Sequence, residues 1–236
     1  MVPFPPPPLP LLCRKRALRA PFSDTERREA LANMIVSMTL NLALALAAAY
    51  LVGSIDFAVI VARMHGVDIR QVGSGNPGAS NVMRSIGRVP GAMVLAGDTI
   101  KGVVAAAMGM VASGTAHPQT HWAVLAGLCA VIGHCYPIFH RFRGGKGVAT
   151  GLGVLFFTVP WAGLIVLVTW TVLVRLIKMA SVSSLIAMAI AVPLAIWQGA
   201  SGLALVWLGA TIVLIVWRHR ANIARVLRGS EQKVTT

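Results

Sequence analysis

Three polar, glycine-rich segments interrupt an otherwise apolar chain, and their residue types are those that bind phosphate groups. The first is VGSGNPGASNVMRSIGR, residues 72–88. Glycines let backbone N–H groups approach an anion closely, and an arginine binds a phosphate through two parallel hydrogen bonds. A plain turn needs fewer such residues, so we interpret this segment as a binding loop. Its candidate ligands are Gly73, Ser74, Gly75, Asn76, Asn81 and Arg84.

The second segment, RFRGGKGVATG at residues 141–151, places a lysine among glycines directly before an apolar stretch. The N-terminus of a helix is electropositive, so this arrangement favours a bound phosphate. The spacing differs from a Walker A loop, and no strand precedes it. Three basic residues would also serve as a topology signal, but topology needs only charge and not glycines. The candidate ligands are Gly144, Gly145, Lys146 and Gly147.

The third segment, WRHRANIARVLRGSE at residues 217–231, follows the last apolar stretch. His219 and Asn222 lie close enough to the membrane interface to act there, but the residues alone leave their role open. For Arg225 and Arg228 we predict contact with anionic lipid headgroups.

Ionisable residues also occur inside apolar stretches, where they are costly and usually face the interior of a helix bundle. Asp98 and Lys101 lie three residues apart on one helix face, which fits a structural ion pair as well as direct chemistry. His134 is placed to orient the second glycine-rich segment. No metal site or cofactor is predicted, because the nearby cysteines and histidines do not share a helix face. Those residues are Cys129, His134, Cys135 and His140.

Composition identifies the elements that must position these residues. The 236 residues are 56% hydrophobic and 12% charged, against about 25% charged in soluble domains. Apolar runs long enough to cross a bilayer recur from Leu40 to Trp217. The sequence therefore predicts an all-α, polytopic membrane protein with glycine-rich cytoplasmic loops. The net charge of +14 fits basic cytoplasmic loops, and no segment resembles a nucleic-acid-binding surface.

Seven transmembrane helices are expected. The stretch from Val148 to Ile177 is long for one span, but folding back at Pro160 places every basic loop on one side, as the positive-inside rule prefers. The N-terminus is then outside, the C-terminus is cytoplasmic, and all three glycine-rich segments share the cytoplasmic face. The predicted spans are 40–61, 91–112, 122–139, 148–177 as two short helices, 183–198 and 203–217.

The first 37 residues differ from the rest, because they contain four consecutive prolines and a basic cluster. They predict a disordered N-terminal extension, in front of a membrane domain at 38–236. A start at Met34 or Met38 would account for this extension, and a targeting segment is the alternative.

The three segments together resemble the bacterial acyl-phosphate:glycerol-3-phosphate acyltransferases of the PlsY type. GSGNPGASN, then HCYP with FRGGKGVATG, and HRANI with RVLRG are similar to that family's three cytoplasmic motifs. LAGDTIKG and the SVSS stretch at 181–184 also look like family segments. The resemblance implies an inner-membrane enzyme that transfers a fatty acyl group from acyl phosphate to the 1-hydroxyl of glycerol 3-phosphate, giving lysophosphatidic acid.

The resemblance also implies residue roles. Ser74, Arg84, Lys146, His219 and Asn222 would form the active site, and the glycines and asparagines named above would hold the substrate phosphates. Asp98, Lys101, His134 and Ser181 would support them. The hydroxyl proton would leave to His219 or to the donor's own phosphate. Expected partners are the two substrates, membrane lipids and the enzyme that makes acyl phosphate. The sequence leaves the oligomeric state open and is compatible with a monomer.

Two positions depart from the family pattern. Asp56 stands where the family has proline, and Ala221 stands where it has glutamate. An ion pair involving Asp56 would account for the first. A transporter for a phosphorylated anion is the alternative from another class, although the two halves show no repeat. A CDP-alcohol phosphotransferase would need clustered aspartates, which are scattered here.

Overall fold

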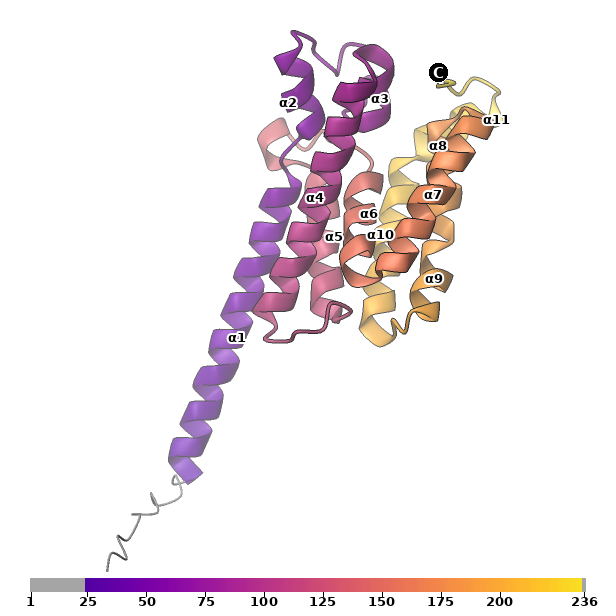
Figure 1. Ribbon diagram of the computed structural model, residues 1–236. Helices are drawn as coiled ribbons and strands as arrows, with labels where there is room; N and C mark the ends of the chain where they lie inside the picture. The colour runs from indigo at the N-terminus through magenta and orange to yellow at the C-terminus, as the bar shows by residue number, and fades with distance from the viewer. Residues whose placement is uncertain (1–23, 235–236) are drawn as a thin grey trace, which may run out of the picture. The chain divides into compact units, whose positions relative to one another are not determined.

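All regular structure is helical in the part of the chain described by this computed structural model, residues 24–234 (Figure 1). The helices are α1 (Asp24–Gly53), α2 (Phe57–Met64), α3 (Ala79–Ser85), α4 (Arg88–Ala112), α5 (His121–Cys135), α6 (Val148–Thr158), α7 (Pro160–Ile177), α8 (Ala180–Ala189), α9 (Ala191–Trp197), α10 (Gly202–Arg218) and α11 (Arg220–Leu227), with a 3-10 turn at Ile138–His140.

Residue contacts divide the chain into two units, with the boundary between Ser37 and Met38. The described part of the first unit is helical from Asp24, and the acidic Asp24 and Glu26 in the first turn suit the positive end of a helix. The expected disorder is therefore wrong for residues 24–37. Residues 1–23 of the predicted extension lie outside the described residues.

Several helices match the length and composition of membrane spans. Five segments are long and apolar enough: Asp24–Met64, Arg88–Ala112, His121–His140, Pro160–Ile177 and Ala180–Trp197. Helices α10 and α11, bent by 53° at their junction, raise the number to six if taken as one span. The predicted all-helical membrane architecture is thus confirmed. Seven full spans are not reached by length, because the 11 residues of α6 extend only about 16 Å against about 30 Å of bilayer core.

The long apolar stretch folds back where the sequence predicts. Helix α6 ends at Thr158, Val159 has non-helical dihedral angles, and α7 begins at Pro160. Proline suits the first position of a helix, where its missing N–H group is not needed. Gly163 of α7 packs against the backbone of Phe156 in α6, so α7 folds back against α6.

Close helix contacts in the second unit depend on glycines that leave no room for a side chain. A Cβ atom on Gly102 of α4 would overlap the carbonyl oxygen of Thr150 in α6, and one on Gly153 of α6 would overlap that of Thr99 in α4. Small residues permit such contacts between membrane helices, where van der Waals packing drives association. This packing fixes α6, whose first turn belongs to the second glycine-rich segment.

Gly153→Ala is expected to lower the free energy of unfolding by about 1–3 kcal/mol, because α4 and α6 must move apart to admit the methyl group. The thermal unfolding midpoint of the purified protein in detergent measures the effect. Gly209→Ala in α10 is the matched control, since a Cβ atom there meets no atom within 4 Å. Equal midpoints for the two variants would contradict this account of the packing.

The short helices and loops that carry the glycine-rich segments gather at one end of the helices of the second unit (Figure 1). Asp56 orders this region by accepting a hydrogen bond from the Val59 N–H at the start of α2 (3.1 Å) and by pairing with Arg70 (3.3 Å). Arg70 also donates to the carbonyl of Arg143 at 3.1 Å. The ion pair suggested for this unusual aspartate is therefore present, and Arg70 connects the start of α2 to the second glycine-rich segment.

Candidate active site

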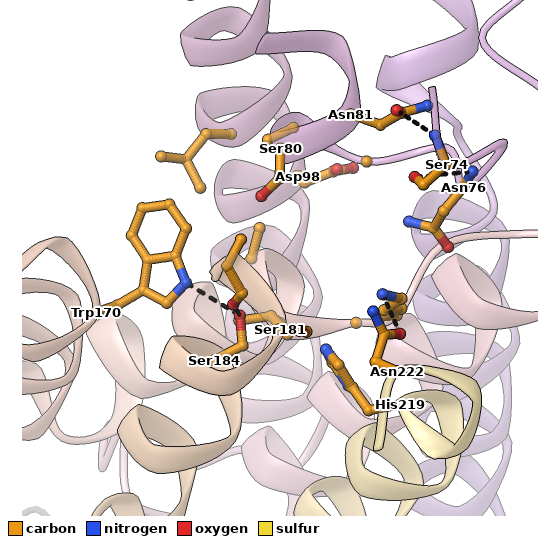
Figure 2. A pocket seen from close by; sticks show the side chains of 18 of the residues that line it. Ser74, Asn76, Ser80, Asn81, Asp98, Trp170, Ser181, Ser184, His219 and Asn222 are labelled. Atoms are coloured by element: carbon orange, nitrogen blue, oxygen red, sulfur yellow. Dashed lines mark hydrogen bonds between the residues drawn. The ribbon is translucent and has the colours of Figure 1, made fainter. Parts of the chain in front are cut away.

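A cavity at this end of the second unit brings the three glycine-rich segments together with α4, α6, α7 and α8 (Figure 2). All five predicted catalytic residues line it: Ser74, Arg84, Lys146, His219 and Asn222. The lining also includes Asn76, Asn81, Gly147, Asp98, His134 and Ser181 from the other predicted positions. Gly73, Gly75, Gly144, Gly145 and Lys101 are not among the lining residues.

Asn81 holds the first loop in shape. Its Oδ1 accepts from the backbone N–H of Ser74 at 2.9 Å, and its Nδ2 donates to the carbonyls of Ile69 (3.2 Å) and Val72 (3.1 Å). These bonds use both ends of the amide, and Gly73 beside it has a φ of 58° that favours glycine. Asn81 is therefore placed to present Ser74 rather than to bind a ligand with its own amide.

The second loop is fixed from behind by His134 and Arg218. The guanidinium of Arg218 donates to the carbonyls of Gly145 (3.0 Å) and Gly144 (2.7 Å). A Cβ atom on Gly145 would overlap the His134 ring, and one on Gly144 would overlap the His134 carbonyl. The two glycines thus serve close packing beneath the loop, which leaves Lys146 as the group that the loop presents to the cavity.

His134 belongs to a buried polar group next to the cavity. Lys101 Nζ forms an ion pair with Asp98 Oδ1 (2.7 Å), and it donates hydrogen bonds to the carbonyl of Ile55 (2.7 Å) and to His134 Nδ1 (3.0 Å). An ammonium has no acceptor, so Nδ1 must accept and a neutral His134 carries its proton on Nε2. Asp98 is thereby neutralised by Lys101, and both stabilise the histidine that packs under Gly145.

His219 lies at the bend between α10 and α11 and is almost fully buried, with 1% of its surface exposed. Its Nδ1 lies 2.8 Å from the carbonyl of Ile215. A carbonyl only accepts, so Nδ1 carries the proton and Nε2 of the neutral ring keeps a free lone pair. The bend also turns Asn222 towards the cavity, where Figure 2 shows it beside His219.

A chain of hydrogen bonds joins Lys146 to the C-terminal residues. Lys146 Nζ donates to Asn222 Oδ1 (2.6 Å), and Asn222 Nδ2 donates to Glu231 Oε1 (2.6 Å). The same carboxylate accepts from Ser181 Oγ (2.6 Å) and from Arg225 Nε (2.8 Å). Glu231 therefore orients three side chains of the cavity at once.

No role was predicted from the sequence for Glu231, and lipid contact was predicted for Arg225. The structure instead places Arg225 in the cavity lining, paired with Glu231. A sequence signal was available, since Glu231 is the only acidic residue after Asp98. A single carboxylate in a segment with several arginines is expected to form an ion pair with one of them. Gln232 was missed too, and it accepts a hydrogen bond from Arg84.

The charges of the cavity favour an anionic ligand. Asp98 is paired with Lys101 and Glu231 with Arg225, whereas neither Arg84 nor Lys146 forms an ion pair with a carboxylate among the described residues. The Nε atom of Arg84 is buried and has no hydrogen-bond partner within the same residues. Two cations from different segments therefore carry a charge that no carboxylate among the described residues pairs with, which favours phosphate oxygens as ligands.

The local environment changes the pKa of two groups in these loops. Burial lowers the pKa of Lys146 to about 8, an effect that Glu231 opposes and the arginines Arg225, Arg218 and Arg84 reinforce. For Glu231, burial raises the pKa, but hydrogen bonds from Ser181, Asn222 and Arg225 outweigh it, so the pKa lies below its usual value. At neutral pH both groups are charged.

The other side of the cavity is apolar. It is formed by Leu95 of α4, Val148 and Leu152 of α6, Val166, Leu167 and Trp170 of α7, and Ala187 of α8. A cavity with unpaired cations at one side and hydrocarbon at the other suits an amphiphile with a phosphorylated head group. Within residues 24–234, no three His, Cys, Asp or Glu side chains gather as metal ligands would.

Known proteins share this sequence and fold. The family described as glycerol-3-phosphate acyltransferase matches residues 43–229. The glycerol-3-phosphate acyltransferase of Hydrogenovibrio crunogenus is 44% identical over 197 residues, which cover 80% of this chain and 90% of that protein. That of Halorhodospira halophila is 43% identical over 189 residues, covering 78% and 92%.

Solved structures agree with the sequence relatives. The crystal structure of PlsY (YgiH), an integral membrane glycerol 3-phosphate acyltransferase, in its glycerol 3-phosphate form superposes with a TM-score of 0.77 at 36% identity, covering 83% of this chain and 96% of that one. Its lysphosphatidic acid form gives a TM-score of 0.75 at 35% identity, covering 81% and 94%.

Fold, cavity and relatives together define an integral membrane acyltransferase. More particularly, the chain belongs to the glycerol-3-phosphate acyltransferase family. The resemblance inferred from the three glycine-rich segments is therefore confirmed at the level of the family.

Proposed function

We propose that this protein transfers a fatty acyl group from acyl phosphate to the 1-hydroxyl of glycerol 3-phosphate, giving lysophosphatidic acid and inorganic phosphate, as the first step of phospholipid synthesis. The observation that carries the proposal is the cavity in which Arg84 and Lys146, two cations with no carboxylate partner within residues 24–234, face an apolar side. Both proposed substrates bear a phosphate, and only the donor bears a long hydrocarbon chain.

The reaction needs two phosphates held close together and charge stabilised on the phosphate that leaves. Arg84 and Lys146 come from separate segments, which supports binding of one phosphate by each or both by the pair. The hydroxyl oxygen attacks the acyl carbon, a new C–O bond forms, and the bond between the acyl carbon and the phosphate oxygen breaks. No covalent enzyme intermediate is required, because acyl phosphate is already activated.

The attacking hydroxyl must lose its proton during this step. His219 Nε2 has a free lone pair, since Nδ1 donates to Ile215, and this supports His219 as the acceptor. The donor phosphate is the other candidate, and its oxygens would lie beside the same cations. Ser74 and Asn222 are proposed to orient the substrates, with Asn81, Asp98, Lys101, His134 and Ser181 as positioning residues.

The proposed membrane arrangement has seven crossings, with α6 and α7 as consecutive short crossings on either side of Pro160. The N-terminus is outside, the C-terminus is cytoplasmic, and the cavity faces the cytoplasm of a bacterial inner membrane. Basic residues that follow α5 and α10 at the cavity end support this orientation under the positive-inside rule. A cytoplasmic cavity can receive its donor from the enzyme that makes acyl phosphate.

The test uses the purified protein in lipid with labelled glycerol 3-phosphate and three donors offered separately: acyl phosphate, acyl-CoA and acyl-carrier protein. The proposal expects lysophosphatidic acid from acyl phosphate alone. Product from acyl-CoA or acyl-carrier protein alone would overturn the donor assignment. No product from any donor would overturn the proposed reaction, and flux of phosphorylated anions into sealed vesicles would then test a transporter.

The pKa of Lys146 sets an expected pH dependence. Because kcat/KM reports ionisations of the free enzyme, it is expected to hold below about pH 8 and to fall above it, as the ammonium loses its proton. Measurement of kcat/KM between pH 6 and 10 checks this. The kcat/KM of Lys146→Arg, however low, should not fall at alkaline pH, since a guanidinium stays charged.

Glu231→Gln is expected to move that alkaline decline to lower pH. The carboxylate raises the pKa of Lys146, so its removal leaves burial and the arginines unopposed. The amide of glutamine keeps the size of the side chain, which limits rearrangement of Asn222. A decline that stays in place or moves to higher pH would contradict the assignment to Lys146.

A further inference from the structure

Trp170 is the largest side chain on the apolar side of the cavity. Figure 2 shows it across the cavity from Ser74 and Asn76, with its indole directed towards α8. An indole ring on the apolar side of the cavity does not bind phosphate oxygens. The ring is instead placed where a chain attached to a bound head group would pass.

One hydrogen bond holds the ring in a single orientation. Trp170 Nε1 donates to Ser184 Oγ at 3.0 Å, and the Ser184 hydroxyl donates its own proton to the carbonyl of Ala180 at 2.7 Å. The serine proton is thus used within α8, and its oxygen is left to accept from the indole. Because the polar atom of the ring is satisfied by α8, hydrocarbon is what the ring offers to the cavity.

Helix α8 shows that the ring lies beyond the polar layer. Ser181, Ser184 and Ala187 follow one another at three-residue intervals and all line the cavity. Ser181 bonds Glu231 in the polar layer, whereas Ala187 carries only a methyl group. Along α8, the cavity lining therefore changes from polar to apolar at Ser184, the residue that holds Trp170.

We infer that Trp170, held by Ser184, makes the cavity selective for unbranched acyl chains. This inference rests on the proposed function, in which the acyl chain of the donor occupies the apolar side. The ring must break its hydrogen bond to Ser184 to turn aside for a branch, and a methyl group forced against the ring costs roughly a five- to hundredfold loss in kcat/KM. A straight chain meets no such obstacle.

The experiment compares straight hexadecanoyl phosphate with methyl-branched isomers of the same carbon number, branched at carbon 2, 4 or 6. Equal carbon number keeps the hydrophobicity of the donors similar, so their kcat/KM ratio reports shape. The wild-type protein is expected to prefer the straight donor by about tenfold or more at one branch position at least. Trp170→Ala should reduce that preference to within about threefold.

Ser184→Ala and Trp170→Phe provide milder variants that keep most of the packing. Ser184→Ala removes the acceptor of the indole and should lower the preference while the ring remains. Its matched control is Ser183→Ala, because Ser183 is buried and bonds the Met179 carbonyl (3.0 Å) but does not line the cavity. Trp161→Ala is the control for Trp170, since Trp161 belongs to the same helix and is exposed.

The outcomes separate the inference from the function on which it rests. Equal preference in the wild-type protein, Trp170→Ala and Ser184→Ala would overturn the inference while the proposed reaction stands. A loss of rate that is the same for every donor would overturn it too, because a purely structural role predicts that result. No turnover of any acyl phosphate by the wild-type protein would overturn the proposed function first.

Discussion

Lys146→Ala is expected to lower kcat/KM for acyl transfer by about a thousandfold or more. The ammonium is one of two cavity cations without a carboxylate partner among the described residues, and loss of a single donor to a developing oxyanion already costs about a hundred- to thousandfold. Initial rates of lysophosphatidic acid formation in lipid, with both substrates varied, give the measurement.

The loss should come without loss of membrane insertion, because α4, α5 and α6 pack through glycines away from Lys146. Lys233→Ala is the control, since Lys233 is exposed in the same C-terminal region as Glu231. Near-normal turnover by Lys146→Ala would remove this residue from the proposed active site.

Arg84→Ala is expected to reduce transfer by a similar factor, and Arg84→Lys should recover little of it. The guanidinium reaches the cavity from α3 with a buried Nε that has no partner among the described residues. A lysine restores charge, but it lacks the planar pair of donors that matches two phosphate oxygens. The kcat/KM for each substrate, measured separately, tells which phosphate the arginine binds.

Arg88→Ala supplies the comparison, because Arg88 is exposed a few residues further along the chain and does not line the cavity. Full recovery of activity by Arg84→Lys would mean that charge alone is required at this position. Wild-type rates for Arg84→Ala would place the phosphate elsewhere.

The local signals in the sequence were sufficient to find the five predicted catalytic residues that line the cavity, but not all of its lining. Ser74, Lys146 and Asn222 lie in three separate polar segments. Because all three segments are expected on the same side of the membrane, they indicate a shared binding site. The turn at Pro160 followed from proline chemistry together with the loop charges. These are properties of single segments, which is why they can be predicted before the fold is known.

Other features depend on contacts between distant segments. Phosphate binding by Gly144 and Gly145 stays a prediction, and the structure adds that the two glycines leave room for His134 of α5. Arg225 was expected to meet lipid because charge alone does not tell which face of α11 looks inward. Its pairing with Glu231 required the residues after α11 to return over the cavity.

The number of membrane spans was the weakest part of the sequence prediction. Hydropathy finds an apolar run, but α6 is too short to qualify by length and α10 qualifies only together with α11. The close contact between Gly102 and Thr150 determines where α6 lies, and that contact cannot be inferred from the composition of either segment.

The chain of hydrogen bonds from Lys146 through Asn222 to Glu231 has a consequence for biosynthesis. Its last member, Glu231, follows α11, which ends at Leu227, so the cavity is complete only after the residues beyond this helix have been made. A product that stops directly after α11 would hold Arg84 and Lys146 without the carboxylate that orients their neighbours. Loss of these residues should therefore impair the site although all the helices that line the cavity are present.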